Sequence, residues 1–282
     1  MRFVNANGRA AIVVEGSVYL LSEISGGEIA DDPQKALEQS WERIVEVADE
    51  GSYDSGKVLE SVKLGPPVPS PKAIFGIGLN YKDHAAEAGM EVPQVPPVFT
   101  KFPTSICGPF DELIIPSRES KVDYEAELVF VISRPAKNVM ASEALEYIAG
   151  FMCGQDFSER TLQMTAGRQF SIGKSFDTFF PMGPYLVSTD EVGDPAGLNV
   201  RCLVNGEVCQ SGNTKDMVFG VAELVEFLSS VVTLRPGDVC LTGTPAGVGF
   251  VKNPPRFLAP GDVVETEIER IGRMKNFVVA GY

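Results

Sequence analysis

Cysteine is scarce in this chain, and its few copies are scattered. Five of the 282 residues are cysteines, and no two of them form a C-x-x-C pair. An odd number of irregularly spaced cysteines argues against a disulfide framework. We therefore expect reduced, mostly buried thiols and a cytoplasmic protein. We assign no cysteine a catalytic role, because the chain has only one histidine that could activate a thiol.

Long apolar stretches and excess basic charge are also missing. No segment approaches ~20 consecutive apolar residues, the length that a membrane-spanning helix needs. The N-terminal M-R-F-V-N-A-N-G-R-A lacks the apolar core of a signal peptide. With 24 basic and 38 acidic residues, the formal net charge is -14 and the pI is near 4.6. We therefore expect neither a membrane nor a nucleic acid as a partner.

A proline-rich segment divides the sequence. The stretch G-P-P-V-P-S-P at 65–71 holds four prolines, and within it residues 66–71 predict a stiff linker. Before the linker, residues 1–65 show three short strand patterns separated by turn residues and then a helical pattern over 33–50. These features predict a small N-terminal α+β domain.

Strand patterns dominate residues 72–282, which form the larger predicted domain. Short β-branched and aromatic runs alternate with Gly, Pro and Asn, and helical patterns interrupt them at 142–150, with Ser142 as N-cap, and at 217–230. Many strands with few helices predict an α+β fold that is predominantly β, a sandwich or roll rather than alternating βαβ units.

Two glutamates lead into an apolar strand pattern, V-D-Y-E-A-E-L-V-F-V-I at 122–132. Alternate residues of a strand share a face, so Glu125 and Glu127 point the same way. An E-x-E pair alone is more often a solvated strand end, but here it leads into a buried stripe. Asp156 falls where a later strand should end. Three carboxylates without Cys or His fit Mg²⁺, with Mn²⁺ or Ca²⁺ as alternatives.

The one histidine lies in G-L-N-Y-K-D-H-A-A-E-A-G, between glycines 78 and 89. His84 and Glu87 are three residues apart, and on a short helix they share a face. The carboxylate can then hold the imidazole in one tautomer. The flanking glycines would allow this segment to move as a lid. The simpler alternative is a histidine–carboxylate pair that only stabilises the helix.

Two glycine-containing loops follow. A-G-R-Q-F-S-I-G-K-S at 166–175 resembles a phosphate-binding loop, but Arg168 stands where the first glycine is required, so we reject a nucleotide site. We expect Lys174 to lie near an oxyanion instead. T-G-T-P-A-G-V-G at 242–249 is either a plain turn or a loop whose N–H groups and Thr244 hydroxyl face a substrate carboxylate.

Taken together, these residues resemble the fumarylacetoacetate hydrolase family over nearly all of residues 73–279. The resemblance rests on several motifs in the order of the family. They are G-L-N-Y-K-D-H-A-A-E, F-T-K-F-P-T-S, V-D-Y-E-A-E-L, Q-D-F-S-E-R-T-L-Q, G-K-S-F-D-T-F-F-P-M-G-P, V-N-G-E and L-R-P-G-D-V-C-L-T-G-T-P-A-G-V-G.

The resemblance implies a mixed β-sandwich roll, a homodimer and a role for each candidate residue. The roles are metal ligation by Glu125, Glu127 and Asp156, a catalytic dyad of His84 and Glu87 with Lys174 beside it, and substrate contacts from Arg160, Gln163 and Thr244. The founding enzyme has a further metal-binding aspartate where this chain has Ile77. That difference favours the acylpyruvase-like branch and counts against fumarylacetoacetate as the substrate.

The implied chemistry is that of a small 2-oxo acid. The leading hypothesis is a metal-dependent hydrolase that cleaves a C–C bond in an acylpyruvate-like β-diketo acid through a metal-stabilised enolate. His84 would take a proton from water, and Lys174 and Gln163 would bind oxyanions. The alternatives are a decarboxylase or enol–keto isomerase of a 2-oxo dicarboxylate, of the oxaloacetate or 2-hydroxyhepta-2,4-diene-1,7-dioate type, and a non-catalytic binding protein on the same fold.

Overall fold

A long mixed β-sheet runs through the protein. The computed structural model describes residues 1–51, 53, 56–166 and 169–282. Its 12-stranded sheet is hydrogen-bonded in the order β4 (Lys57–Val58), β3 (Ser17–Leu20), β2 (Arg9–Val14), β1 (Arg2–Ala6), β14 (Phe180–Ser188), β12 (Ile148–Gln155), β11 (Ala126–Ile132), β17 (Val239–Leu241), β6 (Ile74–Ile77) and β7 (Val98–Thr100), with β5 (Leu64–Gly65) on β1 and β8 (Ile106–Cys107) on β14.

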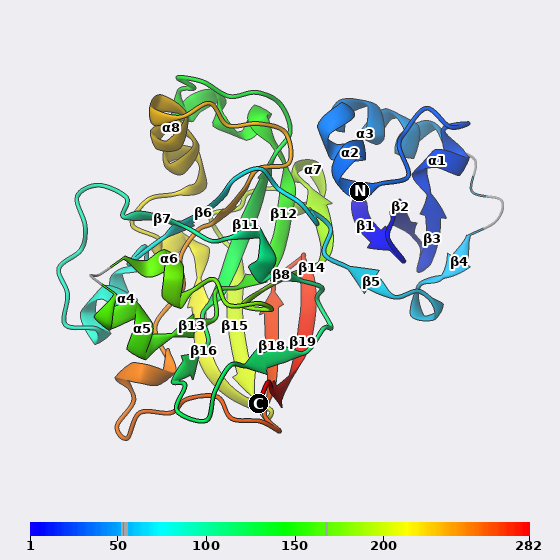
Figure 1. Cartoon of the computed structure of the whole chain (residues 1–282). Coiled ribbons are helices and arrows are strands. Elements are labelled where there is room, and N and C mark those ends of the chain that lie inside the picture. The colour runs from blue at the N-terminus through cyan, green and yellow to red at the C-terminus, as the bar shows by residue number, and fades with distance from the viewer. Residues whose placement is uncertain (52, 54–55, 167–168) are drawn as a thin grey trace.

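A second, five-stranded sheet packs against the centre of the first (Figure 1). Its order is β16 (Glu207–Asn213), β15 (Asn199–Val204), β18 (Val263–Ile268), β19 (Gly272–Ala280) and β9 (Leu113–Ile115), and a two-stranded pair joins β10 (Val122–Asp123) to β13 (Ser158–Glu159). Leu128 and Phe130 of β11 share a core with residues of β15, β18 and β19. Packing of two sheets through such a core gives the sandwich that the sequence predicts.

The opposite face of β11 faces a second core, which extends to the N-terminal helices. Val129 and Val131 belong to this core, which also includes Leu37, Trp41 and Ile44. The helices of the described chain are α1 (Leu21–Ile24), α2 (Pro33–Gln39), α3 (Trp41–Glu50), α4 (Lys82–Glu87), α5 (Arg160–Thr165), α6 (Phe170–Gly173), α7 (Thr189–Val192) and α8 (Val221–Val231), with 3₁₀ turns η1 (Leu59–Ser61), η2 (Pro103–Ser105), η3 (Ala141–Tyr147), η4 (Thr214–Asp216) and η5 (Gly249–Val251). Because one core includes Leu128 and Phe130 and the other includes Val129 and Val131, β11 is buried on both faces.

The N-terminal strands extend the large sheet rather than forming a separate one. β1 pairs antiparallel with β14, with Phe3 opposite Leu186. The single helix expected over 33–50 is wrong, because Ser40 is extended and its side chain caps α3 through the Arg43 N–H. The boundary at residues 66–71 stays a prediction, and the sheet is continuous across it.

Two further secondary-structure elements differ from what the sequence patterns predict. The helix expected over 142–150 is the 3₁₀ turn η3 with Met140 as N-cap, and Ile148 already begins β12. Every residue of β12 is buried, so its apolar run has no alternation by which to recognise a strand. Strand β19 was not predicted, because the buried Asn276 interrupts its apolar face.

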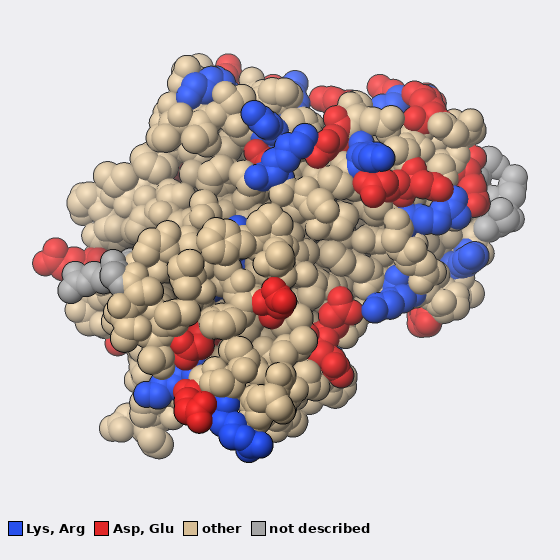
Figure 2. Space-filling view, viewed as in Figure 1, with Lys and Arg blue, Asp and Glu red and all other residues tan. Residues whose placement is uncertain are grey.

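The surface features agree with the charge and hydropathy patterns. In the part of the chain that the structure describes, no helix has the length and apolar character needed to cross a bilayer. On the face shown in Figure 2, acidic side chains are interspersed among the basic ones. Four of the five cysteines are buried, and Cys209 is half-buried. The expected absence of nucleic-acid partners stays a prediction.

Candidate metal centre and active site

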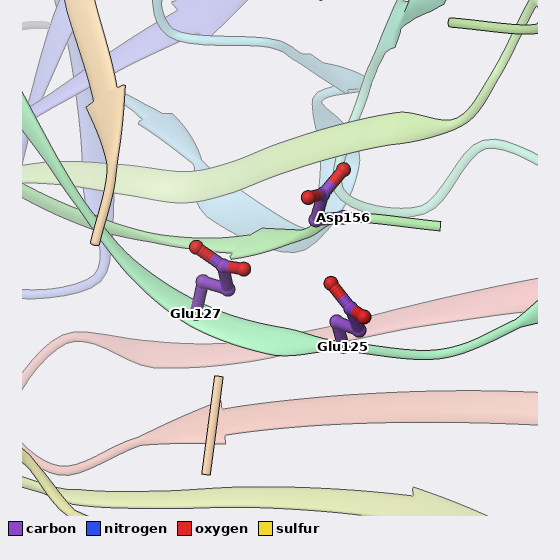
Figure 3. A group of neighbouring side chains, drawn as sticks. All are labelled: Glu125, Glu127 and Asp156. Atoms are coloured by element: carbon purple, nitrogen blue, oxygen red, sulfur yellow. The ribbon is translucent and has the colours of Figure 1, made fainter. Parts of the chain in front are cut away.

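Two neighbouring strands bring the three predicted metal ligands together. Glu125 precedes β11, Glu127 lies within it, and Asp156 follows the adjacent β12. The register pairs Glu127 with Gly154, and the Asp156 N–H donates to the Glu125 carbonyl over 2.9 Å. One carboxylate oxygen from each residue lies within 4.8 Å of the others. The three carboxylates face a common space (Figure 3).

The environment of these acids fits a divalent cation. All three are buried. Burial and the neighbouring Asp156 and Glu125 charges raise the pKa of Glu127 well above its usual range. Burial alone would raise the pKa of Glu125 also, but the Lys174 and Arg160 charges lower it to about 2. A hard cation with oxygen ligands would relieve the repulsion that acts on Glu127.

The raised pKa of Glu127 predicts a stability effect. In the folded protein the Glu127 carboxyl keeps its proton to a higher pH than in the unfolded chain, where its pKa is near the unperturbed value of 4.5. The contribution of Glu127 to the free energy of unfolding therefore falls as the pH rises from 4.5 through the pKa of the folded state. Glu127→Gln should therefore raise the melting temperature of chelator-treated protein at about pH 8, and the gain should shrink towards about pH 5. Scanning fluorimetry can measure both. Glu119→Gln, an exposed control, should change neither, and a pH-independent gain would contradict the explanation.

Two buried lysines contact these carboxylates. Lys174 Nζ lies 2.7 Å from Glu125 Oε2 and 2.5 Å from Asp156 Oδ2. Lys101 Nζ donates to Asp156 Oδ1 over 2.7 Å and to the carbonyl oxygen of Lys174. Burial lowers the pKa of Lys101 despite the neighbouring Asp156. Burial acts in the same direction on Lys174, but Asp156 and Glu125 raise its pKa overall. Lys174 remains cationic and faces the site.

Arg160 is held by acids and an amide at the start of α5. Its Nε and Nη2 both donate to Asp123 Oδ2, over 2.9 and 2.8 Å. Nη2 also lies 2.7 Å from Glu125 Oε1, and Nη1 donates to Gln163 Oε1 over 2.9 Å. Asp123, fully buried, in turn accepts the N–H groups of Gly249 and Phe250. Because Arg160 fixes the oxygen of the Gln163 amide, the amide NH₂ is left for other partners.

The predicted dyad is assembled on α4. His84 Nδ1 lies 2.8 Å from Glu87 Oε1, and the other carboxylate oxygen of Glu87 accepts the Gly247 N–H over 2.9 Å. With Glu87 ionised, Nδ1 carries the hydrogen and Nε2 is the basic nitrogen. Gly247 has φ +107°, and a β-carbon there would collide with the Cys209 carbonyl. The 242–249 loop therefore orients the dyad through its backbone.

The Thr244 hydroxyl has two partners within the protein. It donates to the Ala126 carbonyl over 2.9 Å and accepts from Gln210 Nε2 over 2.7 Å. Its hydrogen therefore points to β11 rather than to a substrate. The neighbouring Gly243 has φ +97° and donates its N–H to Glu127 Oε2 over 2.6 Å. The loop positions Glu127, a predicted metal ligand, and Thr244 lines the cavity. Substrate contact by Thr244 stays a prediction.

A cavity of about 410 Å³ opens over these groups. All the predicted site residues line this cavity except Glu87 and Asp156. Glu87 contacts the lining residue His84, and Asp156 contacts the lining residue Lys174. The lining is Ile77, Gly78, Leu79, His84, Ala88, Met90, Phe99, Glu125, Glu127, Arg160, Gln163, Met164, Phe170, Lys174, Thr244 and Phe250. Residues 167 and 168 of the rejected phosphate-loop pattern lie outside the described residues.

Sequence reasoning missed two charged members of this site. Lys101 and Asp123 are both buried and bonded to predicted site residues. Each lies inside a motif that carries the family resemblance, F-T-K-F-P-T-S and V-D-Y-E-A-E-L. Asp123 also precedes Glu125 by two residues in an extended segment, which was a usable signal. Lys101 follows β7 with no pattern that distinguishes it from a surface lysine.

Comparison with known families decides the relationship. The model of the fumarylacetoacetate hydrolase C-terminal domain matches residues 73–279. The chain belongs to the fumarylacetoacetate hydrolase family. A structure from Mycobacterium smegmatis superposes with a TM-score of 0.95 at 40% identity, covering 100% of both chains. The predicted predominantly β fold is thereby confirmed.

Two relatives in this family have named activities. The human protein named oxaloacetate tautomerase FAHD2A, mitochondrial, is 48% identical over 214 residues, 76% of this chain and 68% of that protein. The maleylpyruvate hydrolase of Sphingobium sp. SYK-6, solved with manganese(II) and pyruvate, superposes with a TM-score of 0.81 at 27% identity over 100% of both chains. The prediction of an enzyme within this family is confirmed, and hydrolysis as its reaction is not.

The predicted cytoplasmic location is wrong. Relatives from Rattus norvegicus, Homo sapiens and Xenopus laevis are named as mitochondrial proteins. The prediction rested on the cysteines, which bear on the redox state of a compartment but do not identify the compartment.

Proposed function

We propose that this protein is a metal-dependent enol–keto tautomerase of 2-oxo acids of the oxaloacetate type. One observation carries the proposal: a histidine whose Nδ1 is fixed by Glu87 lines the same cavity as the carboxylate cluster. Tautomerisation needs one group that moves a proton and one that stabilises negative charge on the 2-oxygen. The oxaloacetate tautomerase relatives support this choice over the hydrolase that the motifs favoured.

Glu125, Glu127 and Asp156 would hold the cation, which we propose to be Mg²⁺, with Mn²⁺ or Ca²⁺ as alternatives. The manganese in the maleylpyruvate hydrolase structure supports a divalent ion at such a site. When bound, the cation would supply a Lewis acid that polarises the 2-oxo acid. Side chains of the protein would carry out the proton transfers and bind the substrate.

His84 carries the proton transfer in this proposal. Ketonisation removes a proton from the enol hydroxyl and adds one at C3. As C2–O becomes a double bond, the electron pair of the C2=C3 double bond takes up the proton at C3, and no bond between heavy atoms is broken. Nε2 of His84 accepts the first proton and delivers one to C3, while Glu87 holds the ring and stabilises the imidazolium. The Gly247 N–H keeps Glu87 in place during both transfers.

Lys174 and Gln163 bind the head of the substrate. The Lys174 ammonium lines the cavity beside Glu125, where it can stabilise negative charge on the 2-oxygen. The Gln163 NH₂ is a second donor, because Arg160 occupies its carbonyl oxygen. We propose that Arg160 acts by positioning Gln163 and Glu125, in addition to any direct contact with the substrate.

Hydrolysis of an acylpyruvate is the second candidate. The observation that favours it is the superposition on maleylpyruvate hydrolase over the whole chain. The same Nε2 would then take its proton from water rather than from the enol. Decarboxylation needs mainly an electron sink at the 2-oxygen and makes a smaller demand on His84.

A panel of 2-oxo acids separates these reactions. Wild-type protein with Mg²⁺ or Mn²⁺ is mixed with oxaloacetate enol, acetylpyruvate and maleylpyruvate, and enol decay, CO₂ release and carboxylate release are scored separately. We expect enol decay to be accelerated most. Hydrolysis without accelerated enol decay would favour the second candidate, and no turnover would indicate a binding protein.

We propose that the protein is a homodimer, as the family resemblance implies. Light scattering coupled to size exclusion at micromolar concentration should give about twice the chain mass of 30.4 kDa. A single species at the monomer mass would contradict this proposal.

A further inference from the structure

Each glutamate of the carboxylate cluster has one oxygen bonded to a donor of the protein. Arg160 Nη2 lies 2.7 Å from Oε1 of Glu125. The Gly243 N–H donates to Oε2 of Glu127 over 2.6 Å. These bonds leave one oxygen of each side chain for a cation, Oε2 of Glu125 and Oε1 of Glu127.

Asp156 is held in the same way, by Lys101. Lys101 Nζ donates to Oδ1 of Asp156 over 2.7 Å, and neither side chain is exposed. The other oxygen, Oδ2, lies 2.5 Å from Lys174 Nζ, which also lies 2.7 Å from Glu125 Oε2. Lys174 belongs to the described lining of the cavity, and Lys101 does not. Oδ2 of Asp156 therefore lies on the cavity side, and Oδ1 lies against the protein behind it.

Lys101 is itself fixed against the segment that carries Lys174. Its Nζ donates to the carbonyl oxygen of Lys174 as well as to Asp156. One residue further along, the Phe102 N–H donates to Oγ of Ser175 over 3.0 Å. Because both the ammonium and the adjacent backbone are bonded to this segment, Lys101 Nζ is held at Oδ1 of Asp156.

A site that offers one oxygen from each of three carboxylates suits a small cation. Mg²⁺ and Mn²⁺ take about six oxygen ligands in an octahedral arrangement, and waters or a chelating substrate can complete the set. Ca²⁺ is larger, takes more ligands and often binds both oxygens of one carboxylate. A donor that holds the second oxygen of a carboxylate prevents that additional contact.

From these bonds we infer that Lys101 sets the cation preference of the site. By holding Oδ1 it limits Asp156 to one ligand oxygen, which favours Mg²⁺ and Mn²⁺ over Ca²⁺. The inference rests on the proposed metal-dependent function and adds the choice of cation. Of the three donors, Lys101 can be replaced most selectively, because Arg160 lines the cavity and Gly243 acts through its backbone.

The ratio of Mg²⁺ affinity to Ca²⁺ affinity tests this role without turnover. Chelator-treated, full-length protein is titrated with Mn²⁺ by calorimetry, and Mg²⁺ and Ca²⁺ are measured by competition with Mn²⁺. Wild-type protein should bind Mg²⁺ more tightly than Ca²⁺. Lys101→Met, which keeps the approximate volume of the side chain, should lower the ratio by about tenfold or more, because Asp156 can then offer both oxygens to Ca²⁺. The loss of a positive charge acts alike on two divalent cations and largely cancels in the ratio.

Two further variants separate this role from a general loosening of the site. Lys101→Gln shortens the side chain and should shift the ratio in the same direction, which provides a second test if Lys101→Met does not fold. Ser175→Ala removes the acceptor of the Phe102 N–H but leaves Lys101 Nζ on Asp156, so the ratio should stay unchanged. An unchanged ratio in the Lys101 variants, an equal shift in Ser175→Ala, or tighter binding of Ca²⁺ than of Mg²⁺ by the wild type would overturn the inference.

The result can be separated from the proposed reaction. If the ratio shifts as expected but no 2-oxo acid is tautomerised, the proposed reaction fails and the role of Lys101 stands. If oxaloacetate enol is tautomerised with Mg²⁺ and the ratio is the same in the Lys101 variants, the proposed function stands and the role of Lys101 fails. Wild-type protein that binds none of the three cations would overturn the inference together with the metal site.

Discussion

Replacing His84 with glutamine should lower kcat for enol–keto tautomerisation by about 10²–10⁴-fold, the usual cost of losing a positioned acid–base group. The affinity for Mn²⁺ should stay nearly unchanged, because His84 bonds to Glu87 and not to the carboxylate cluster. Stopped-flow absorbance gives the rate and calorimetry the affinity. Glutamine keeps the polarity and approximate size of the side chain on α4, so the variant should fold.

Glu87 supplies the matched comparison. Glu87→Gln should reduce kcat by a smaller factor, since it removes the charge that stabilises the imidazolium but keeps a hydrogen-bond acceptor for Nδ1. Glu91→Gln changes an exposed carboxylate shortly after α4 and should have no effect. Wild-type kcat in His84→Gln would show that the dyad is not the proton-transfer group. Equal loss of metal binding and rate would show that the variant disturbs the whole site.

Removing Asp156 should have the second large effect. Replacing a residue that hydrogen-bonds to a metal ligand lowers metal affinity by about 10–100-fold. Asp156 is itself a proposed ligand, so Asp156→Asn should weaken Mn²⁺ binding by more than about 100-fold. Tautomerisation should fall with it, and chelation of the wild-type protein should remove activity that added Mg²⁺ or Mn²⁺ restores. Calorimetry and the enol assay measure the two quantities on the same samples.

Asp123→Asn is the control for this variant. Asp123 is as deeply buried as Asp156 and bonds to Arg160, but it is not a proposed ligand. Asp123→Asn should weaken metal binding less than Asp156→Asn does, by the factor of about 10–100 expected for a residue that supports the ligands without contacting the metal. Full activity of the wild-type protein in excess chelator would refute the metal assignment, as would Mn²⁺ binding by Asp156→Asn at the wild-type affinity.

The carboxylate cluster could be predicted because its geometry follows from local rules. Alternation along β11 puts Glu125 and Glu127 on one side, and a strand ending at Gln155 puts Asp156 beside them. The His84–Glu87 pair follows from helical spacing in the same way. Beyond their own elements, these residues need only the antiparallel pairing of β11 with β12, the next long strand in the chain.

The supporting charges could not be predicted from local rules. Lys101 follows β7 and reaches Asp156 because β7 lies at the edge of the large sheet. The strand order of that sheet cannot be predicted from any single segment of the sequence. The hydroxyl of Thr244 looked available in the sequence, but Gln210 from the five-stranded sheet and Ala126 from β11 occupy it. Contacts between distant elements decide which polar groups face the cavity, and local patterns do not contain them.

The N-terminal region shows the same limit. Its strands and the amphipathic pattern of its helices were visible, but the pairing of β1 with β14 was not. The proline-rich segment at 66–71 suggested separation, whereas Trp41 and Ile44 pack in the same core as Val129 of β11. Chain stiffness at a linker does not reveal whether the segments that it joins share a sheet.

In the proposed mechanism, His84 moves protons to and from C3 of a 2-oxo acid held beside the carboxylate cluster. Exchange of the C3 hydrogens of oxaloacetate with deuterium, followed by proton NMR in D₂O, tests it most directly. Wild-type protein with Mg²⁺ should accelerate this exchange, and His84→Gln should lose the acceleration while retaining its metal. Accelerated exchange that is the same in His84→Gln as in the wild type would contradict it.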